Sequence, residues 1–341
     1  MDYRQAGVDI DAGHEVVRRI RTLARGTHTP GVLSEIGAFG GLFHLGAADM
    51  NDPVLVASAD GVGTKLRVAF MAGVHDTIGR DLVNHCVNDI LVQGAQPLFF
   101  LDYLATGRLD PDVAVHIVEG LAAACRENGC ALLGGETAEM PGFYADGEYD
   151  VAGFIVGAVP RERIIDGRGI GPGDVLIGLP SSGLHTNGYS LVRRIVFDVA
   201  QLEIDAHVPV LGTTVGAALL APHRSYLSSV RPLLGDGVIK GMAHITGGGI
   251  TDNLPRVLPE GTEAVVQRST WEVPPIFRWL SELGRVADDE MLRAFNMGIG
   301  LVMACAAADA EAVLERLRVA GEGGATVIGV VRPGRGAVVY E

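Results

Sequence analysis

The sequence predicts an α+β protein built of two mixed α/β domains. The chain has 341 residues, which is enough for two domains of ordinary size with a core in each. Apolar runs typical of buried strands alternate with helical segments along both halves. The stretch 166–175 is rich in Gly, Pro and charge, and it separates two apolar strands with no helix between them. We therefore predict a first domain over 1–168 and a second over 169–341.

The first half predicts four strands and two long helices. The clearest helix follows Asp110, which can cap it, because Pro111 suits the first helical position and Gly129 can close the end. The other helix is expected at 76–93. The strands are expected at 53–59, 97–105, 130–135 and 149–159.

The second half repeats the mixed pattern. Strands are expected near 174–179, 238–245, 262–267, 297–304 and 325–331. Helices are expected near 187–199, 214–234, 274–283 and 307–320. No period of 20 to 50 residues recurs, so the sequence does not indicate a solenoid.

The composition excludes several classes of function. The count of 27 Lys+Arg against 41 Asp+Glu gives a net charge of -14, which argues against a nucleic-acid-binding surface. The 4 cysteines form no C-x-x-C pair, so we expect neither a zinc ribbon nor a disulfide framework. The N-terminus lacks an apolar signal segment, and no run approaches the roughly 18 apolar residues of a membrane span. We expect a cytoplasmic protein that binds neither nucleic acid nor membrane.

The stretch "SADGVGTK", 58–65, follows an apolar strand and could form an anion or metal site. It is not a Walker loop, because Thr64 precedes Lys65, and it lacks the third glycine of the dinucleotide fingerprint. What remains is a carboxylate, Asp60, on a glycine turn beside a cation, as a metal and phosphate site requires. Taken alone, the stretch favours an ordinary turn with a surface lysine.

Two further segments place acids next to predicted strands. In the helix 76–93, Asp81, His85 and Asp89 recur every four residues on one face, where a solvated helix side is the alternative. In "LLGGETAEMPG", 132–142, Glu136 follows a strand, where the alternative is an exposed acid after a Gly-rich turn. Asp60, Asp89 and Glu136 together form a set that suits Mg²⁺.

The second half offers two candidate phosphate loops. In "LPSSGLHTNGYSLVRR", 179–194, Thr186 and Asn187 are possible caps of a helix whose N-terminal amides could hold phosphate. In "HITGGGITDNLPRVL", 244–258, a strand ends in a histidine, a hydroxyl and three glycines before a helix, so backbone amides could approach a ligand closely. His185 and His244 are single histidines, a kind of residue that is more often structural than catalytic.

Eight motifs together resemble the family of phosphoribosylformylglycinamidine cyclo-ligases, also called aminoimidazole ribonucleotide synthetases. The resemblance runs in the same order from about residue 3 to the C-terminus. The motifs are "AGVDIDAG" (6–13), "DGVGTKL" (60–66), "HDTIGRDLVNHCVNDILVQGAQPLFFLDYLATG" (75–107), "GGETAEMPGFY" (134–144), "DVAGFIVG" (150–157), "SSGLHTNGYSLVR" (181–193), "HITGGGITDNLPRVLP" (244–259) and "FNMGIG" (295–300).

The resemblance implies a ligase of de novo purine biosynthesis. Such an enzyme uses ATP and Mg²⁺ to close formylglycinamidine ribonucleotide into 5-aminoimidazole ribonucleotide, through phosphorylation of the formyl amide oxygen, with release of ADP and phosphate. It also implies a homodimer in which the N-terminal sheets pair into a β-barrel, and a C-terminal α/β sandwich that binds the ribonucleotide phosphate.

The resemblance assigns roles to individual residues of this sequence. Catalytic roles fall on Asp60, Lys65, Asp89 and Glu136. ATP-binding roles fall on Asp60, Gly61, Gly63, Thr64, Lys65, Asp81, Asn88 and Gly135. Substrate-binding roles fall on Ser182, His185, Thr186, Asn187, His244, Thr246, Gly247, Gly248 and Gly249. Metal-binding roles fall on Asp60, Asp89 and Glu136.

Two other readings compete with this one. The first is another enzyme with an acidic ATP site of this kind: selenophosphate synthetase, thiamine-phosphate kinase or the hydrogenase maturation dehydratase. Selenophosphate synthetase is expected to carry a reactive N-terminal cysteine, whereas the first cysteine here is Cys86. A catalytically silent nucleotide-binding subunit is the second alternative. Where the family can place a lysine over the triphosphate, this chain has Arg21, Arg25 and His28, so that role is not assigned.

Overall fold

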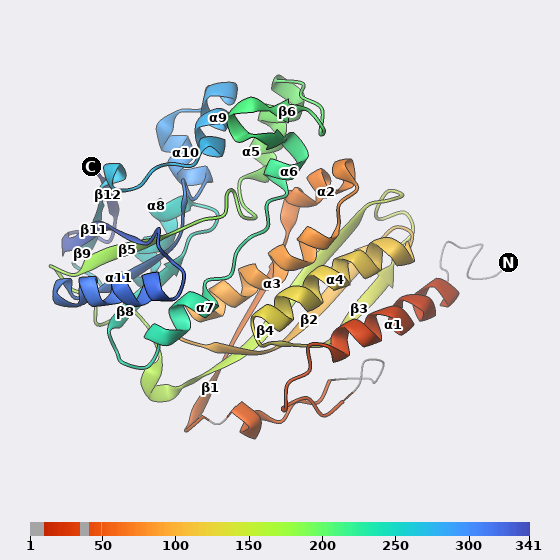
Figure 1. Cartoon of the computed structure of the whole chain (residues 1–341), viewed down its shortest axis with the longest axis horizontal. Helices are drawn as coiled ribbons and strands as arrows, with labels where there is room; N and C mark the ends of the chain where they lie inside the picture. Colours follow the sequence, from red (N-terminus) through yellow and green to blue (C-terminus); the bar gives the residue numbers. More distant parts are fainter. Residues whose placement is uncertain (1–9, 35–40, 49) are drawn as a thin grey trace. The chain divides into compact units, whose positions relative to one another are not determined.

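The computed structural model describes residues 10–34, 41–48 and 50–341 (Figure 1). Residues 6–9 of the first quoted motif lie outside this part of the chain. The chain divides into two compact units, which we describe separately. Unit 1 runs through Ile90 and resumes over Ala95–Arg161, and unit 2 comprises Leu91–Gly94 and Glu162–Glu341. The main change of unit thus falls at 161/162, whereas the sequence placed the domain boundary at 168/169.

Unit 1 is built on a mixed four-stranded sheet with the strand order β1-β4-β2-β3. The pairs β1/β4 and β2/β4 are antiparallel, and β2/β3 is parallel. The strands are β1 (Pro53–Gly61), β2 (Gln96–Thr106), β3 (Ala131–Glu139) and β4 (Tyr149–Pro160). All four predicted strands are therefore present.

Helices cover one face of this sheet. In Figure 1, α1, α3 and α4 lie side by side across it. The helices of unit 1 are α1 (Ile10–Arg25), α2 (Leu66–Ala72), α3 (Asp76–Leu91) and α4 (Pro111–Glu127). The predicted cap of α4 is confirmed, since the Asp110 carboxylate accepts hydrogen bonds from the backbone N–H groups of Asp112 and Val113, and Pro111 follows it.

Two glycines let α3 cross α4 closely. A Cβ atom on Gly79 of α3 would lie 2.2 Å from the carbonyl oxygen of Ile117, and one on Gly120 of α4 would lie 1.9 Å from that of Asp76. Neither position tolerates a side chain. Helix α3 also packs on β4, where a Cβ on Gly157 would lie 2.5 Å from the Ile90 side chain. This packing fixes the helix that carries the acidic residues of interest.

The other face of the unit 1 sheet is apolar and partly exposed. Leu55, Tyr103 and Phe154 point to this face and are 56%, 37% and 46% exposed. The alternation along β4 places buried residues on the helix side and intermediate or exposed ones on the opposite side. A sheet face with this composition is expected to be covered by another surface.

Unit 2 contains a six-stranded sheet of order β12-β9-β11-β5-β10-β8. Every pairing is antiparallel except β12/β9, which is parallel. Every residue of β10 is buried, as expected of a strand in the core. The strands are β5 (Val175–Pro180), β8 (Ile239–His244), β9 (Thr262–Val266), β10 (Ile299–Cys305), β11 (Thr326–Pro333) and β12 (Val338–Tyr340), and a separate pair is formed by β6 (His207–Val208) and β7 (Thr213–Thr214).

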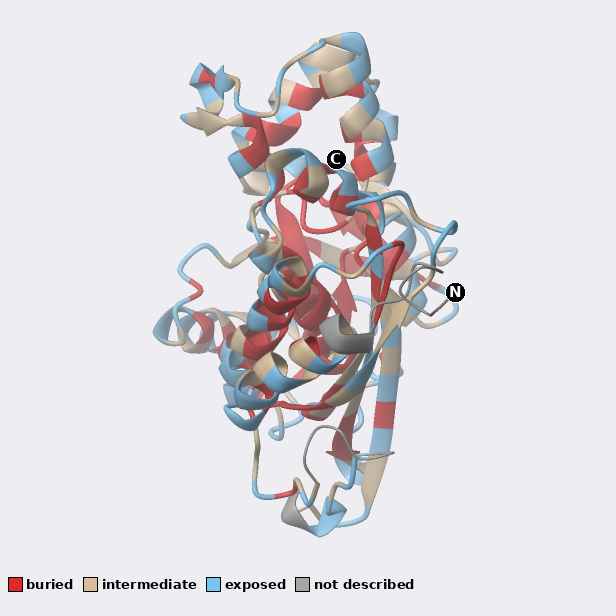
Figure 2. Cartoon of the chain, turned by 90° about the vertical axis from the view of Figure 1, so that its right-hand side faces the viewer, coloured by how far each residue is buried: buried red, intermediate tan, exposed pale blue. Residues whose placement is uncertain are grey.

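The helices of unit 2 are mostly short. They are α5 (Tyr189–Arg193), which continues as a π-helix over Arg194–Val199, α6 (Val215–Leu219), α7 (Leu227–Val230), α8 (Gly249–Asn253), α9 (Pro275–Gly284), α10 (Asp288–Ala294) and α11 (Ala310–Val319). Figure 2 shows buried residues along the strands and on one side of many helices, with exposed residues on the other side.

The predicted single helix at 214–234 is wrong. The chain is helical over α6 and α7, but the residues between Leu219 and Leu227 are not helical. Pro222 lies in this gap and lacks the N–H group that a continuous helix needs. The break matters because His223 lies in it.

The predicted mixed α/β organisation in two domains is confirmed. Within the described residues neither sheet closes on itself into a barrel. The same residues include no helix that is both long and apolar enough to cross a membrane.

Asp102 gives the stability of the fold a predictable pH dependence. It lies on β2 opposite Gly135 and Gly153, and burial raises its pKa from 3.8 to about 7. The folded chain therefore holds this proton more tightly than the unfolded chain. The contribution of protonated Asp102 to the free energy of unfolding is fully present below about pH 4. It is lost as the pH rises to about 7, by at most about 1.4 kcal/mol per pH unit.

We expect Asp102→Asn to remove this loss. Urea denaturation at pH 5, 6, 7 and 8 should show the variant gaining free energy of unfolding over the native chain up to pH 7, and then a constant difference. Asp146→Asn, at an exposed acid, is the control. Parallel curves for Asp102→Asn and the native chain would contradict the assigned pKa.

Candidate active site

The first group of predicted site residues surrounds the end of β1 and one face of α3. Asp60, near the end of β1, accepts a hydrogen bond from the Gly61 N–H at 2.7 Å. Its other oxygen lies 2.7 Å from Nε2 of His85, on α3. The strand end and the helix are therefore joined by a carboxylate–imidazole contact.

Asp89 lies beside the same imidazole. Its Oδ2 is 3.8 Å from Nε2 of His85, and it accepts a hydrogen bond of 3.1 Å from the Ser58 hydroxyl of β1. The side chains of Asp60 and Asp89 are 38% and 26% exposed. The structure thus brings these two predicted metal ligands together around one nitrogen, with both carboxylates open to solvent.

The charges of this group shift one another's pKa values. Burial raises the pKa of Asp60, but the hydrogen bond and charge of His85 and the Gly61 amide outweigh burial, so the net shift is downward. Burial lowers the pKa of His85, but the hydrogen bond to Asp60 and the charges of Asp89 and Asp60 outweigh burial, so the net shift is upward. The geometry therefore favours an ionised Asp60 and a protonated His85.

Lys65 is not on the surface of the turn. Its side chain is fully buried, and its Nζ lies 2.7 Å from Oδ2 of Asp81, which is also fully buried. Direct contact of these two residues with ATP therefore stays a prediction, and the structure shows them paired with each other. Burial lowers the pKa of Lys65 and the charge of Asp81 opposes that shift. We infer that the pair positions the turn and α3.

The other predicted ATP-site residues divide in the same way. Gly63 and Thr64 are exposed on the turn after β1, and Gly63 has φ +66°, a conformation that favours glycine. Asn88 is fully buried on α3 and cannot contact a ligand at the surface without rearrangement. The exposed part of the site therefore consists of the turn and the two carboxylates.

Glu136 does not join Asp60 and Asp89. It lies on β3 opposite Tyr103, and the strand order places β4 and β2 between β1 and β3. Three strand spacings correspond to about 14 Å, whereas ligands of one Mg²⁺ lie about 2 Å from the ion. Within one chain, the predicted three-carboxylate set is therefore not assembled around one ion, and Gly135 and Glu136 are exposed at a separate place on the sheet.

Two carboxylates on a rigid strand and helix nevertheless fit Mg²⁺. This ion is typically bound through one or two carboxylates while it keeps several waters or phosphate oxygens. The carboxylates of Asp60 and Asp89 lie close together beside His85, and Ser58 orients the second of them. These two side chains therefore offer the oxygen ligands that Mg²⁺ prefers.

In unit 2 the loop 181–188 follows β5. The Ser182 N–H donates to Nε2 of His185 at 3.2 Å, and the Ser182 hydroxyl donates to the Pro222 carbonyl at 2.7 Å. His185 has φ +61°, which is uncommon for a residue other than glycine. The predicted caps are wrong, since the residue preceding α5 is Gly188 and no side chain caps that helix.

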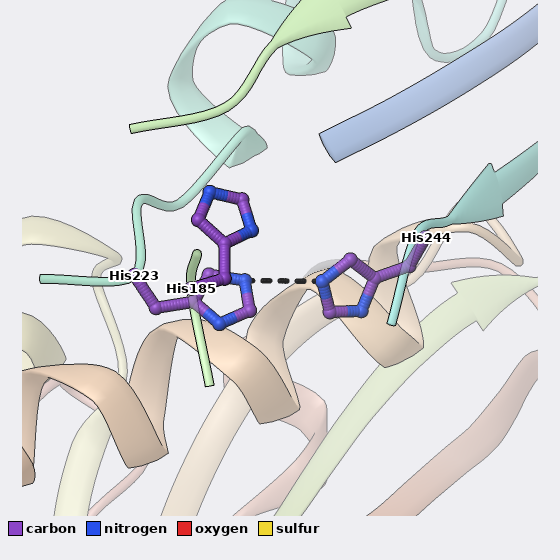
Figure 3. Close-up of side chains that lie close together, drawn as sticks. All are labelled: His185, His223 and His244. Atoms are coloured by element: carbon purple, nitrogen blue, oxygen red, sulfur yellow. Dashed lines mark hydrogen bonds between the residues drawn. The ribbon is translucent and has the colours of Figure 1, made fainter. Parts of the chain in front are cut away.

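Thr186 instead contacts a histidine that the site prediction omitted. Its hydroxyl lies 3.3 Å from Nδ1 of His223, and Nε2 of His223 lies 3.1 Å from Nε2 of His244. His185 stacks on His223, with ring centroids 4.0 Å apart. Figure 3 shows the three imidazoles gathered together, with the contact between His223 and His244 drawn as a dashed line.

The glycine loop 246–249 is held by one side chain. The Asn253 amide nitrogen donates to the carbonyls of Gly247 and Gly249 at 3.0 and 2.9 Å, and the Thr246 hydroxyl donates to Oδ1 of Asn253 at 3.2 Å. A Cβ on Gly247 would lie 3.4 Å from Oδ1 of Asn187, so the two predicted loops lie next to each other.

Sequence reasoning missed His85 and His223 as members of the two sites. The spacing of α3 indicated that His85 shares a face with Asp81 and Asp89, but histidines of this kind are usually structural. For His223 the one signal was Pro222, which indicates a break in segment 214–234 but does not show where the histidine points.

Comparison with known proteins identifies the family. The chain matches the family described as "AIR synthase related protein, N-terminal domain" over residues 45–159 and its C-terminal counterpart over 171–341. It is 58% identical to phosphoribosylformylglycinamidine cyclo-ligase of Trichlorobacter lovleyi, over 94% of this chain and 92% of the relative. The chain belongs to the phosphoribosylformylglycinamidine cyclo-ligase family. The same-named protein of Cupriavidus pinatubonensis is 56% identical over 94% of this chain and 91% of that relative. The chain is therefore an enzyme, a ligase.

More distant solved structures share the fold. Thiamine-monophosphate kinase from Stenotrophomonas maltophilia superposes with a TM-score of 0.69 at 18% identity, covering 96% of both chains. Hydrogenase maturation protein HypE in complex with ATP superposes with a TM-score of 0.66 at 20% identity, covering 96% of this chain and 91% of that one. At these identities the similarity concerns the fold alone.

The buried pair of Lys65 and Asp81 can be tested by removing one charge. We expect Lys65→Met to lower the free energy of unfolding by about 3–5 kcal/mol, because Asp81 then remains buried without its partner charge. Urea denaturation measures this loss. Lys65→Met/Asp81→Asn, which removes both charges, should recover part of it. A variant Lys65→Met with native stability and a raised KM for ATP would instead support a direct contact with phosphate.

Proposed function

We propose that this enzyme carries out the ATP-dependent cyclisation of formylglycinamidine ribonucleotide to 5-aminoimidazole ribonucleotide in purine biosynthesis. Its membership of the cyclo-ligase family, with relatives 52–58% identical over most of the chain, is the observation that carries this proposal. The paired carboxylates beside an exposed glycine turn support an ATP site, and the fold is shared with a protein solved in complex with ATP.

In the proposed reaction, the formyl amide oxygen attacks the γ-phosphorus of ATP, and ADP leaves. An amidine nitrogen of the same molecule then attacks the activated carbon, and phosphate departs with the former amide oxygen. Ring closure is intramolecular, so the enzyme needs no nucleophile of its own. Its task is to position the two substrates and to neutralise charge.

The residues at the end of β1 fit the ATP side of this task. Asp60 and Asp89 would hold Mg²⁺, which neutralises phosphate charge when bound. The exposed backbone of Gly63 and Thr64 would approach the phosphates, since a turn without bulky side chains lets N–H groups reach an anion. Lys65 and Asp81 would keep this turn in register with α3. The catalytic and metal-binding roles of Glu136 stay predictions.

The loops of unit 2 fit the ribonucleotide phosphate. The side-chain amide of Asn253 donates to the carbonyl groups of Gly247 and Gly249 and so fixes the peptide planes of the loop. These two contacts do not use the backbone N–H groups of the loop. Gly247, next to Asn187, and the loop 181–188 supply further donors. We therefore assign the ribonucleotide to Ser182, His185, Thr186, Asn187, His244, Thr246, Gly247, Gly248 and Gly249.

We further propose that the enzyme is a cytoplasmic homodimer. The partly exposed apolar face of the unit 1 sheet, with Leu55, Tyr103 and Phe154, supports pairing of two such sheets face to face.

The net charge of -14 supports a protein that does not bind nucleic acid.

The decisive experiment is ADP release with and without formylglycinamidine ribonucleotide. A site that phosphorylates an amide oxygen should hydrolyse ATP slowly while that acceptor is absent, so we expect the ribonucleotide to raise ADP release strongly. Asp60→Asn should shift the Mg²⁺ dependence of this activity to higher concentration, because it removes one negative ligand at constant volume. Equal ADP release without the ribonucleotide would refute the proposed cyclisation.

The phosphate role of the glycine loop is best tested at Gly247. Gly248 is unsuitable, because its φ of +95° strains any side chain and an added Cβ would lie 2.7 Å from Cβ of Asp252. Gly247→Ala meets only Asn187, so we expect it to fold and to raise the KM for the ribonucleotide by about tenfold or more, the effect of losing one hydrogen bond to a charged group.

Steady-state titration of each substrate measures this effect. Gly323→Ala is the matched control, since an added Cβ there meets no atom within 4 Å. The KM for ATP should stay near its native value in both variants. If Gly247→Ala weakened ATP binding and kept ribonucleotide binding, the assignment of ligands to the two units would be wrong.

A further inference from the structure

Three buried histidines of unit 2 come from three separate segments of the chain. His185 lies in the loop after β5, His223 in the non-helical segment between α6 and α7, and His244 at the end of β8. They are 1%, 0% and 6% exposed. One ring nitrogen from each lies within 4.8 Å of those of the other two. Figure 3 shows how the rings gather.

The spacing of His223 and His244 suits a shared metal ion. Their Nε2 atoms lie 3.1 Å apart. Two imidazole nitrogens bound to one tetrahedral ion, each at 2.0–2.1 Å, lie about 3.3 Å apart. The hydrogen bond between the rings therefore holds both nitrogens at nearly the separation that an ion needs, and an ion would replace the shared proton with only a small movement of either side chain.

Thr186 supplies the outer support that such a ligand requires. When His223 binds an ion through Nε2, its Nδ1 carries the proton and donates to a neighbouring acceptor, which fixes the ring. The Thr186 hydroxyl already lies 3.3 Å from that Nδ1. The segment that carries His223 is itself anchored, because Arg224 pairs with the buried Glu322.

His185 needs a larger adjustment than the other two. Its ring stacks on His223 with an interplanar angle of 17°, and lone pairs of stacked rings do not point at one place. Its Nε2 also accepts the Ser182 N–H. His185 therefore joins the set by turning out of the stack, which makes it the weakest of the three ligands.

We propose that His185, His223 and His244 form a site for a divalent transition-metal ion of the Zn²⁺ class. The ligand set contains three imidazoles and neither carboxylate nor thiolate, and imidazole suits Zn²⁺, Ni²⁺ or Cu²⁺ rather than Mg²⁺ or Ca²⁺. Three protein ligands leave a fourth position for water or an anion, as in metal sites that exchange ligands. All three proposed ligands belong to unit 2, and two of them, His185 and His244, are also among the residues assigned above to the ribonucleotide.

Co²⁺ is the probe, because its visible spectrum reports coordination. Untagged protein is stripped with a chelator, dialysed and titrated with Co²⁺, with Zn²⁺ as competitor and metal content measured by elemental analysis. We expect one equivalent of tightly bound metal, an intense visible band typical of tetrahedral coordination, and displacement of Co²⁺ by Zn²⁺. An Asp60→Asn background removes binding at the carboxylate pair and should leave the band unchanged.

Variants assign the ligands. Because loss of an outer partner alone costs about 10–100-fold in metal affinity, His223→Gln and His244→Gln should each weaken binding by at least about a hundredfold and Thr186→Val by about tenfold. His185→Gln should weaken it less than either. His207→Ala, at an exposed histidine of β6, is the matched control. Thermal melting of metal-free variants checks folding, and Thr186→Val tests the site without removing a histidine.

Three results would overturn the proposal. The first is Co²⁺ binding that His223→Gln and Thr186→Val leave unchanged. The second is a weak band of octahedral type that disappears in Asp60→Asn. The third is no retained metal in the stripped and reloaded native chain, in which case the histidines of unit 2 share protons only.

Discussion

The buried ion pair of Lys65 and Asp81 is the contact on which the geometry of the unit 1 site depends. Taking two charges out of water costs several kcal/mol for each ion, and this cost is offset only if the two groups meet closely. The 2.7 Å contact therefore ties the turn after β1 to one position along α3. His85 and Asp89 lie one and two helical turns beyond Asp81, so the same constraint places them beside Asp60.

The position of α3 depends on two glycines. At Gly79 and Gly120 the backbones of α3 and α4 approach too closely for a Cβ atom, so α3 lies deep against α4 and β4. The polar face of α3 lies on the other side of the helix and is covered by the segment that carries Asp60 and Lys65. With Asp81 and Asn88 fully buried and Asp89 only partly so, Asp89 is the carboxylate that this face of α3 presents to solvent beside Asp60.

Periodicity predicted the fold well and the site in part. The strands of unit 1 and the helix after Asp110 follow directly from apolar runs and capping residues, and the four-residue spacing correctly placed Asp81, His85 and Asp89 on one face. Spacing along a helix does not show which way a face points. It therefore could not show that Lys65 turns inward to meet Asp81 while the neighbouring Thr64 stays exposed.

Contacts between distant segments were the other limit. Glu136 follows a strand much as Asp60 does, and only the strand order β1-β4-β2-β3 shows that the two acids lie three strands apart. His223 was hidden for the opposite reason. Its neighbours resemble a helix. Pro222 explains why the helix breaks, but the local sequence does not show that the broken segment brings His223 to His244.

The carboxylate pair of unit 1 and the histidine cluster of unit 2 offer different kinds of metal ligand. In unit 1 the donors are carboxylates at a strand end and on a helix, oriented by Ser58 and His85 and open to solvent, as a hydrated hard ion requires. In unit 2 the donors are imidazoles that are almost fully buried, and a buried neutral ring avoids the desolvation cost of a buried charge. A chain with an overall charge of -14 can thus keep its anionic donors exposed at one site and its neutral donors enclosed at the other. The ligand atoms decide which class of cation each group suits, and their charge is matched to their burial.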